Sequence, residues 1–416
     1  MDDDPGAPPM PPDTGGPGAT PARSATGGSG ATRTRPGTGA PGVPSARATV
    51  GDGDAAHTQP TIYDVARSAG VSIASVSRVL NDRRSTLPET RERVMQAVAE
   101  LGFIPDGAAR ALSGRLKEVV GVVIRRPTVT PAAADVYADE EESLQFPDLI
   151  NRGIEVAAQR RDFNLLVCSV DTGDHDYSRR IFALARKSDG LILHDQVLGP
   201  DQLARLSGQV PIVTLAGVQT LTTTNVGGDN VAGMRELARH LVHDHGFRTL
   251  AYLSGHAGSP DDIARHATFG AEVTASGASF ADGPQWRGNC YAAGGARVIE
   301  RLLGEGAALP EAIACANDQT ALGVVHALTR HGLDVPRDIA VTGFDDIPVA
   351  RHLRPLLTTV RQPIQQLGAT AFEALYSMVC DGEPAGRNIT LPTSLVRRES
   401  CGCAVGPAPA TRPAAG

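Results

Sequence analysis

The chain has 416 residues, with 39 basic and 46 acidic side chains, a net charge of −7 and 41% hydrophobic residues. This length is enough for two or three domain-sized hydrophobic cores. The sequence contains no run of about 18 apolar residues, which excludes a transmembrane helix. The N-terminus does not resemble a signal peptide. The six cysteines are too scattered for a disulfide framework, so we expect a cytoplasmic protein without a membrane partner.

Two segments at the ends of the chain are predicted to be disordered. Residues 1–59 consist mainly of Pro, Gly, Ala, Ser and Thr, and residues 404–416 have a similar composition. Such segments cannot bury enough apolar surface to offset the entropy lost on ordering. Between them, residues 61–117 carry nine basic and six acidic groups, whereas residues 118–416 have a net charge of −8. Contact with nucleic acid is therefore expected only from the small cationic segment.

Three short helical patterns follow one another between residues 60 and 104. The sequences TIYD from Thr61 and TLPE from Thr86 have the form of a capping box, Ser72 can cap the middle helix, and Gly102 stops the third. Twelve apolar side chains fall at spacings that close one small core: Ile62, Val65, Ala66, Ala69, Val71, Val76, Val79, Leu80, Val94, Ala97, Val98 and Leu101. Two short helices joined by a glycine turn, then a third helix, predict a helix-turn-helix domain.

The rest of the chain has a different pattern. Residues 105–117 form a linker in which Asp106 can cap a short helix. Residues 118–403 alternate short apolar runs with amphipathic stretches, which predicts an α/β body of two doubly wound parallel-sheet lobes. Residues 128–147 match neither periodicity and are predicted to be a loop.

The second helical pattern has the side chains of a recognition helix. Ile73 and Ala74 suit contact with thymine methyl groups, and Arg78, one turn later, can donate two hydrogen bonds to guanine. The alternative is that Ile73 belongs to the core and that Arg78 is a solvated charge. Hydroxyl groups that can position such a helix on phosphates are supplied by Thr61, Tyr63, Ser72, Ser75 and Ser77.

The run from Thr61 to Asn81 (TIYDVARSAGVSIASVSRVLN) closely resembles the DNA-reading headpiece of the LacI/GalR family of transcription regulators. The resemblance extends over about residues 61–403 and includes the sequences LGFIP, ARAL, VGGDN, ANDQTALG, VTGFDDIP, LTTVRQP and LPTSLVRRESC. It implies that Ile73, Ala74 and Arg78 read bases. It also implies a hinge helix containing Asp106 and Ala109, and a Leu112 side chain that enters the minor groove as a wedge.

The family's regulatory domain resembles periplasmic sugar-binding proteins, which implies an effector site between the two lobes. The residues that the resemblance assigns to this site are Arg265, Asn317 and Asp345 and, by looser alignment, His194 and Asn289. Arg125 and Arg126 end the first strand of the body, which suggests an anionic effector such as a sugar phosphate or sugar acid. A surface arginine pair, or a salt bridge to the acidic run at 139–142, is an equally open interpretation.

We predict neither a cofactor nor a metal site from the sequence. His243 and His245 do not share a helix face, and Cys401 and Cys403 have too few companions for zinc. His245 is instead expected at a helix C-terminus before Gly246.

A catalytic site is not predicted either. Asp345 and Asp346 could form a catalytic pair, but a strand-end turn in which one carboxylate contacts ligand is the preferred interpretation. Neither a nucleophile–base pair nor a nucleotide-binding fingerprint is present, so the chain is not expected to be an enzyme.

The predicted function is a DNA-binding transcription regulator, a repressor, gated by a small sugar-like molecule. One headpiece makes too few contacts for strong specificity, which predicts a homodimer on a pseudo-palindromic DNA operator. The C-terminal tail lacks heptads, so a larger assembly is not expected. The alternatives are an effector-independent DNA-binding protein controlled by a protein partner, and a carbohydrate-active α/β enzyme.

Overall fold

The computed structural model describes residues 60–80, 86–103, 116–125, 145–171, 173–194, 197–217 and 220–404. The predicted tails, the hinge helix with Asp106, Ala109 and Leu112, and most of the predicted loop at 128–147 lie outside these residues. The chain divides into two units, Met1–Thr61 and Ile62–Gly416, and the helices and strands described below belong to the second. Among the described helices, none is both long enough and apolar enough to cross a bilayer.

Three helices form the N-terminal domain: α1 (Ile62–Ala69), α2 (Ile73–Leu80) and α3 (Pro88–Leu101). All twelve side chains predicted for its core pack into one cluster, to which Phe103 is added, so the predicted core is confirmed. Ser72 caps α2 by accepting a hydrogen bond from the backbone N–H of Ser75 at 3.2 Å. Gly102 ends α3 in the left-handed conformation, with φ of 62°.

The predicted cap of the third helix is wrong. The N-cap position is Leu87, which makes no side-chain cap hydrogen bond, and Pro88 follows it as the first helical residue. At the first helical position proline lacks only an N–H that would have no partner within the helix, and its fixed φ already suits a helix start. The helix therefore begins one residue later than a cap at Thr86 requires.

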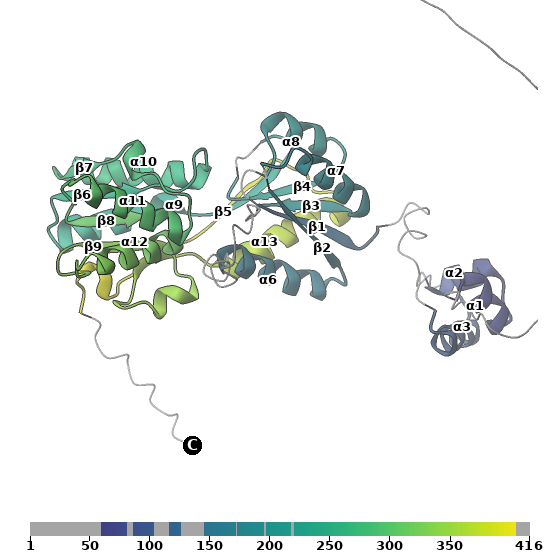
Figure 1. Ribbon diagram of the computed structural model, residues 1–416. Coiled ribbons are helices and arrows are strands. Elements are labelled where there is room, and N and C mark those ends of the chain that lie inside the picture. Colours follow the sequence, from purple (N-terminus) through teal and green to yellow (C-terminus); the bar gives the residue numbers. More distant parts are fainter. Residues whose placement is uncertain are drawn as a thin grey trace, which may run out of the picture. The chain divides into compact units, whose positions relative to one another are not determined.

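The first lobe of the body is built on a six-stranded parallel sheet with the strand order β11-β5-β4-β3-β1-β2 (Figure 1). Its strands are β1 (Val119–Arg125), β2 (Asn164–Val170), β3 (Gly190–Leu193), β4 (Ile212–Leu215), β5 (Thr224–Gly228) and β11 (Asn388–Leu391). Helices α6 (Gln145–Arg160) and α13 (Ile364–Tyr376) cover one face. Helices α7 (Tyr177–Lys187) and α8 (Pro200–Ser207) cover the other.

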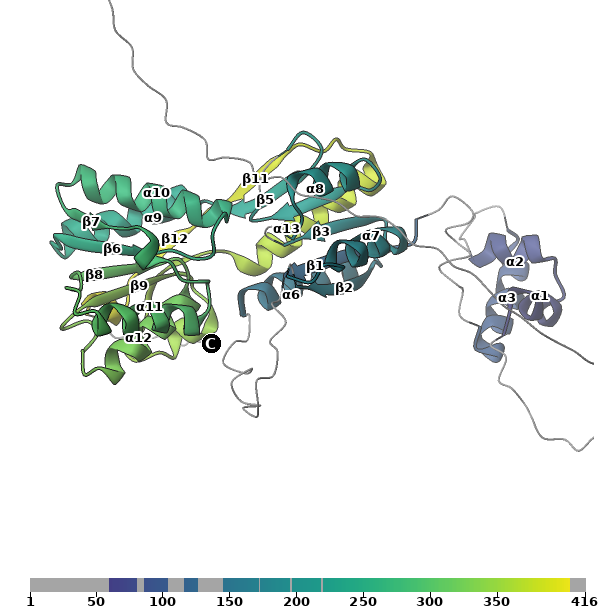
Figure 2. The same ribbon diagram turned by 45° about the horizontal axis from the view of Figure 1, so that its top comes forward.

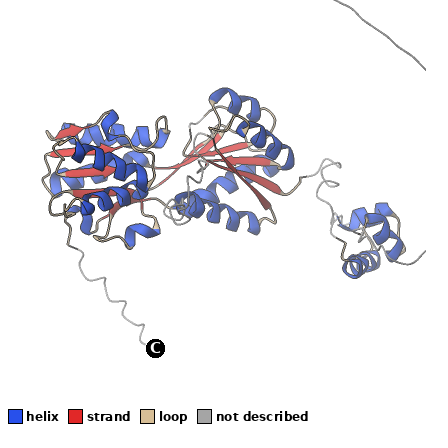
Figure 3. Ribbon diagram, viewed as in Figure 1, coloured by secondary structure: helices blue, strands red, loops and turns tan. Residues whose placement is uncertain are grey.

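The second lobe repeats this arrangement, with the strand order β12-β10-β9-β8-β6-β7. Its strands are β6 (Thr249–Leu253), β7 (Ser279–Ala281), β8 (Ala312–Cys315), β9 (Ala340–Asp345), β10 (Thr358–Arg361) and β12 (Ser394–Val396), of which β12 alone pairs antiparallel. Helices α9 (Asn230–Arg239) and α10 (Pro260–Ala275) pack on one face, and α11 (Ala292–Gly304) and α12 (Asp318–Arg330) on the other (Figure 3). The predicted architecture of two doubly wound lobes is confirmed.

The chain passes between the lobes three times: after β5, after β10 and between β11 and β12 (Figure 2). Short non-α turns accompany these elements: the π-helical turns η1 (His240–Asp244) and η4 (Ser377–Asp381), and the 3₁₀ turns η2 (Pro284–Trp286), η3 (Pro348–Arg351) and η5 (Glu399–Cys401). Because the strands of each sheet are almost all parallel, their carboxyl ends meet at one edge. The loops at this edge supply the candidate ligand site.

Glycines allow the paired helices of each lobe to approach closely. A Cβ atom on Gly153 of α6 would lie 1.9 Å from the carbonyl oxygen of Gln365 in α13. A Cβ atom on Gly323 of α12 would lie 1.8 Å from the carbonyl oxygen of Ala292 in α11. The clash in each case is with backbone, which cannot move aside as a flexible side chain can.

We therefore expect Gly323→Ala to lower the free energy of unfolding by about 1–3 kcal/mol, although alanine is the better helix former. Gly304→Ala is the matched control, because nothing lies within 4 Å of a Cβ atom built at this position near the end of α11. Urea unfolding of both variants measures the difference. Equal stability of the two variants would show that the helix contact tolerates a methyl group.

Candidate functional site

Helix α2 presents the three predicted base-reading side chains on its exposed surface. Ile73 is 41% exposed, and Ala74 and Arg78 are also exposed, whereas Val76 and Val79 point into the core. The Arg78 Nε donates to the backbone oxygen of Ala74 at 3.1 Å. This contact directs the guanidinium along the helix surface and leaves its terminal nitrogens for another acceptor. The alternative that Ile73 belongs to the core is not supported by its exposure.

The predicted phosphate-contacting hydroxyls are distributed around the start of α1 and α2. Tyr63 is 62% exposed, Thr61 and Ser72 are exposed, and Ser75 and Ser77 are half-buried. The Ser72 and Ser75 hydroxyl oxygens lie 2.9 Å apart, so these two side chains are joined by a hydrogen bond. The hinge residues and Leu112 lie outside the described part of the chain.

The body contains a cavity of about 370 Å³ to which both lobes contribute. All six residues predicted for the effector site line it: Arg125, His194, Arg265, Asn289, Asn317 and Asp345. Each lies at or just beyond the carboxyl end of a strand, or on the element that follows. Arg125 ends β1, His194 follows β3 and Asp345 ends β9. The fold thus brings together side chains that are up to 220 residues apart in sequence.

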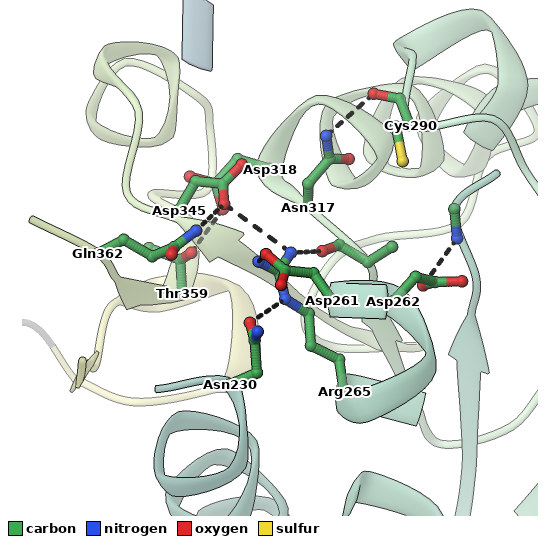
Figure 4. A network of polar contacts seen from close by, with 12 residues as sticks. Asn230, Asp261, Asp262, Arg265, Cys290, Asn317, Asp318, Asp345, Thr359 and Gln362 are labelled. Atoms are coloured by element: carbon green, nitrogen blue, oxygen red, sulfur yellow. Dashed lines mark hydrogen bonds and ion pairs between the residues drawn. The ribbon is translucent and has the colours of Figure 1, made fainter. Parts of the chain in front are cut away.

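Arg265 is buried at the centre of a polar network in the second lobe (Figure 4). Its Nε donates to the Asn230 side chain at 2.7 Å, and its other two nitrogens donate to the Ala316 backbone oxygen and to Asp261. Its guanidinium also lies over the ring of Phe344, 3.7 Å from the centroid. Three of the five guanidinium N–H groups are therefore already used, and the side chain is held rigidly at the cavity wall.

Asp345 is a buried carboxyl group that reaches the cavity from the end of β9. It accepts a hydrogen bond from Gln362 at 2.8 Å, and Arg265 lies 4.0 Å away (Figure 4). Burial raises the pKa of Asp345, and Arg265 and Gln362 offset only part of this effect, so the pKa reaches about 7. Burial and the nearby Asp345 raise the pKa of Asp318 as well. Asp345 can therefore change its charge near neutral pH.

Asn317 and Asn289 are partly engaged within the protein. Asn317 caps α12, because its Oδ1 accepts from the backbone N–H and the hydroxyl of Thr320, while its Nδ2 donates to the Cys290 backbone oxygen. Asn289 accepts from the backbone N–H of Tyr291. Both amides line the cavity, and their bonds within the protein also hold its wall in place.

Asp345 and Asp346 do not act as a pair. The Asp346 side chain is fully buried among Arg351, Arg361 and Arg398, and it does not line the cavity. Burial opposes ionisation of Asp346, but the hydrogen bonds from Arg398 and Arg361 outweigh this effect and lower its pKa. Asp346 therefore serves the packing of the second lobe, and only Asp345 faces the candidate site.

Several cavity residues were not predicted from the sequence: Phe146, Asp171, His256, Asp261, Asp262 and Tyr291. Asp261 and Asp262 lie in the first turn of α10, directly after the loop that leaves β6. Asp262 accepts hydrogen bonds from the Tyr252 hydroxyl and the Gly255 N–H, both at 3.0 Å. A signal was present, since two adjacent acidic residues follow a buried strand.

Comparisons with known proteins agree with both parts of the architecture. The family described as "Bacterial regulatory proteins, lacI family" matches residues 61–106, and the "Periplasmic binding protein-like domain" matches residues 238–401. The HTH-type transcriptional regulator GalS of Salmonella typhimurium is 32% identical over 343 residues, which cover 82% of this chain and 96% of GalS.

Solved structures show the same similarity. A Lac repressor dimer bound to operator and an anti-inducer is 29% identical, with a TM-score of 0.69, and the match covers 83% of this chain and 99% of that chain. The complex of the transcriptional regulator CelR with cellobiose is 26% identical, with a TM-score of 0.59, over 82% of this chain and 99% of that chain. The chain therefore belongs to the lacI family of bacterial regulatory proteins, and it is a DNA-binding transcription regulator and not an enzyme.

Proposed function

We propose that this regulator is a cytoplasmic repressor that binds a pseudo-palindromic operator as a homodimer and is switched by an uncharged, sugar-like effector in the cavity. Residues 60–104 act as the DNA-binding headpiece, 105–117 as the hinge and 118–403 as the effector-binding and dimerisation body. The similarity to an operator-bound Lac repressor dimer supports the DNA and assembly parts of this proposal. The similarity to a cellobiose complex supports the effector class.

The observation that carries the effector proposal is the balance of charge around the cavity. Four carboxylates line it: Asp171, Asp261, Asp262 and Asp345. Arg125 and Arg265 are the arginines among the lining residues, and Arg265 is already bonded to Asn230, Ala316 and Asp261. An anionic ligand would meet more negative than positive groups. We therefore replace the expectation of a sugar phosphate or sugar acid with an uncharged polyhydroxyl ligand.

The remaining lining residues suit the same ligand class. Phe146 and Tyr291 are aromatic, and Ile124, Leu215 and Ala216 add an apolar surface. A sugar ring has apolar faces formed by its C–H groups and a polar edge formed by its hydroxyls. Carboxylates and amides accept from and donate to that edge, while apolar side chains cover the faces.

Thermal unfolding of the full chain with a panel of uncharged sugars, sugar phosphates and sugar acids tests the proposal. A ligand that binds only the folded state raises the midpoint of unfolding according to its concentration relative to its Kd. We expect one or more uncharged sugars to raise the midpoint and to release a selected operator. A larger shift from the phosphorylated or acidic sugars would contradict the proposed effector class. An unchanged midpoint with every sugar would favour control by a protein partner.

The pH dependence of effector binding gives a separate prediction for Asp345. The pKa of Asp345, about 7 in the folded protein, lies above the ordinary value for an aspartate. The protonated form of Asp345 therefore contributes to the free energy of unfolding of the ligand-free protein, and this contribution is lost as pH rises toward 7. A ligand hydroxyl that donates to the carboxylate favours the ionised form, so affinity is expected to increase as pH rises through about 7.

Asp345→Asn resembles the protonated acid in shape and carries no charge. We expect this variant to bind the effector about 10-fold more weakly above pH 8, because a charge-assisted hydrogen bond is replaced by a neutral one. The pH dependence near 7 should also disappear. Calorimetric titration at several pH values measures both effects, and an Asp345→Asn profile parallel to that of the wild type would contradict the assignment.

A further inference from the structure

Four side chains with metal-binding atoms meet in the second lobe, away from the candidate ligand cavity. His240 begins the turn η1 that follows α9, and His245 comes directly after this turn. Cys401 and Cys403 come from the C-terminal segment of the described chain. One ligand atom from each residue lies within 4.8 Å of all the others. Cys401 and His240 are buried, whereas Cys403 and His245 are half-buried, so the cluster lies just under the surface.

Four of the six distances between these atoms are close to those of a tetrahedral site. Zinc binds thiolate sulfur at about 2.3 Å and imidazole nitrogen at about 2.0–2.1 Å, so the ligand atoms of a tetrahedral site lie about 3.3–3.8 Å apart. The His240 and His245 Nε2 atoms are 3.2 Å apart, and the Cys403 sulfur lies 3.4 Å and 3.3 Å from them. The Cys401 sulfur lies 3.5 Å from the His240 Nε2.

The local backbone explains how the two histidines meet. In a π-turn the hydrogen bond joins residues five apart, here the N–H of His245 and the carbonyl of His240. Residues five apart therefore lie on the same face of a π-turn, whereas in an α-helix they lie on different faces. The two rings are 4.7 Å apart and nearly perpendicular, and the ring of His245 stacks on Phe247.

The surrounding hydrogen bonds orient the ligand atoms. The His240 Nδ1 contacts the Asp244 carboxylate at 2.7 Å, and Asp244 also pairs with Arg397. A proton on Nδ1 leaves the Nε2 lone pair directed at the cluster, which is the arrangement of a carboxylate–histidine–zinc triad.

We propose that His240, His245, Cys401 and Cys403 form a structural Zn²⁺ site that fastens the C-terminal segment to helix α9. Two thiolates and two imidazoles are a donor set typical of structural zinc. Four protein ligands leave no position open for a substrate. The site holds the segment that follows β12, the strand reached by the third passage of the chain between the lobes.

The proposed site differs from two interpretations of the sequence. Cys401 and Cys403 do have companions, but these lie 156 or more residues away in the chain. His245 does pair with another histidine, but the partner is His240 and not His243. The two histidines meet because a π-turn joins them, and the α-helical period does not predict such a turn.

The metal content of untagged, full-length protein purified with zinc and a reducing agent tests the proposal. We expect about one Zn²⁺ per chain, and replacement by Co²⁺ should give the intense thiolate-to-cobalt absorption of a tetrahedral site. Cys403→Ser should lose most of the metal and this absorption. Cys168→Ser, which changes a half-buried cysteine in the first lobe, is the matched control and should bind like the wild type.

Asp244→Asn provides a test that preserves all four ligands. It should weaken zinc binding about 10–100-fold, because the carboxylate only orients His240. Wild-type protein that contains no zinc and gives no thiolate-to-cobalt absorption would overturn the proposal. So would a Cys403→Ser variant that binds Co²⁺ as Cys168→Ser does. Circular dichroism of each variant verifies that lost binding does not result from unfolding.

Discussion

Arg78→Ala is expected to weaken binding to a selected operator by about 1–3 kcal/mol for each half-site, and by about 2–6 kcal/mol for a dimer on a palindrome. Non-specific binding should change much less, because only one phosphate-attracting charge per headpiece is lost. Specificity should relax at the base pair that Arg78 reads. This is the largest effect expected from a single change in the headpiece.

The geometry of α2 is the reason for this expectation. The Arg78 side chain is exposed and not part of the core, so its removal leaves the packing of Val76 and Val79 intact. Its Nε is bonded to the Ala74 backbone oxygen one turn earlier, and this bond does not use the terminal nitrogens of the guanidinium. A guanidinium held in this way can donate to two acceptors on one guanine.

An operator selected from a random duplex library provides the probe, and titrations are made at a fixed salt concentration of about 0.15 M. Arg67→Ala is the matched control, because it removes the same charge from an exposed position on α1 that pairs with Asp64. Arg78→Lys retains the charge but not the two-pronged geometry, and should resemble Arg78→Ala in specificity. Arg78→Ala binding that equals the wild type would show that this residue does not read a base.

Asp346→Ala is expected to lower the free energy of unfolding by about 3–5 kcal/mol. The Asp346 side chain is fully buried and contacts Arg351 at 3.2 Å, Arg361 at 2.6 Å and the largely buried Arg398. Removal of the carboxylate leaves the Arg398 charge buried without its partner. The cost is expected to come mainly from this unpaired charge, since Arg351 and Arg361 are half-exposed and can turn to solvent.

Urea unfolding with Asp334→Ala as the control measures this effect. Asp334 is also ion-paired, with Arg337 at 2.6 Å, but both side chains are exposed, so we expect a loss below about 1 kcal/mol. Because the pKa of Asp346 is lowered in the folded protein, its contribution is present above the ordinary aspartate pKa and is lost as pH falls below it. A loss that is independent of pH and equal to that of Asp334→Ala would contradict the assigned role.

The sequence predicts most of the fold because its signals are local. The core of the headpiece follows from helical spacing, and the apolar runs identify the strands β1, β2, β3, β4, β6, β8 and β9. The strands β5, β7, β10, β11 and β12 were not predicted, because they contain few apolar residues in succession. The cap at Thr86 was predicted wrongly because Pro88 starts the helix instead.

The candidate site was also predicted only in part from the sequence. Family motifs and strand ends were sufficient to name Arg265, Asn317 and Asp345, and the fold brings all of them to one cavity. The sequence did not predict which of their hydrogen-bonding groups are already bonded within the protein. This depends on partners such as Asn230 and Gln362, which lie far away in the chain. The proposed change from an anionic to an uncharged effector rests on the carboxylates that line the cavity and on the bonds that already engage Arg265.

By itself the sequence determined the order of domains, the helix-turn-helix motif and the alternation of strands and helices, because each depends on residues close together in the chain. Only the tertiary structure decided that Asp345 and Asp346 face different surroundings, and that Cys401 and Cys403 lie beside His240 and His245. Contacts of this kind join segments up to 163 residues apart, and their geometry depends on how whole elements pack. Local patterns carry the first kind of information and not the second.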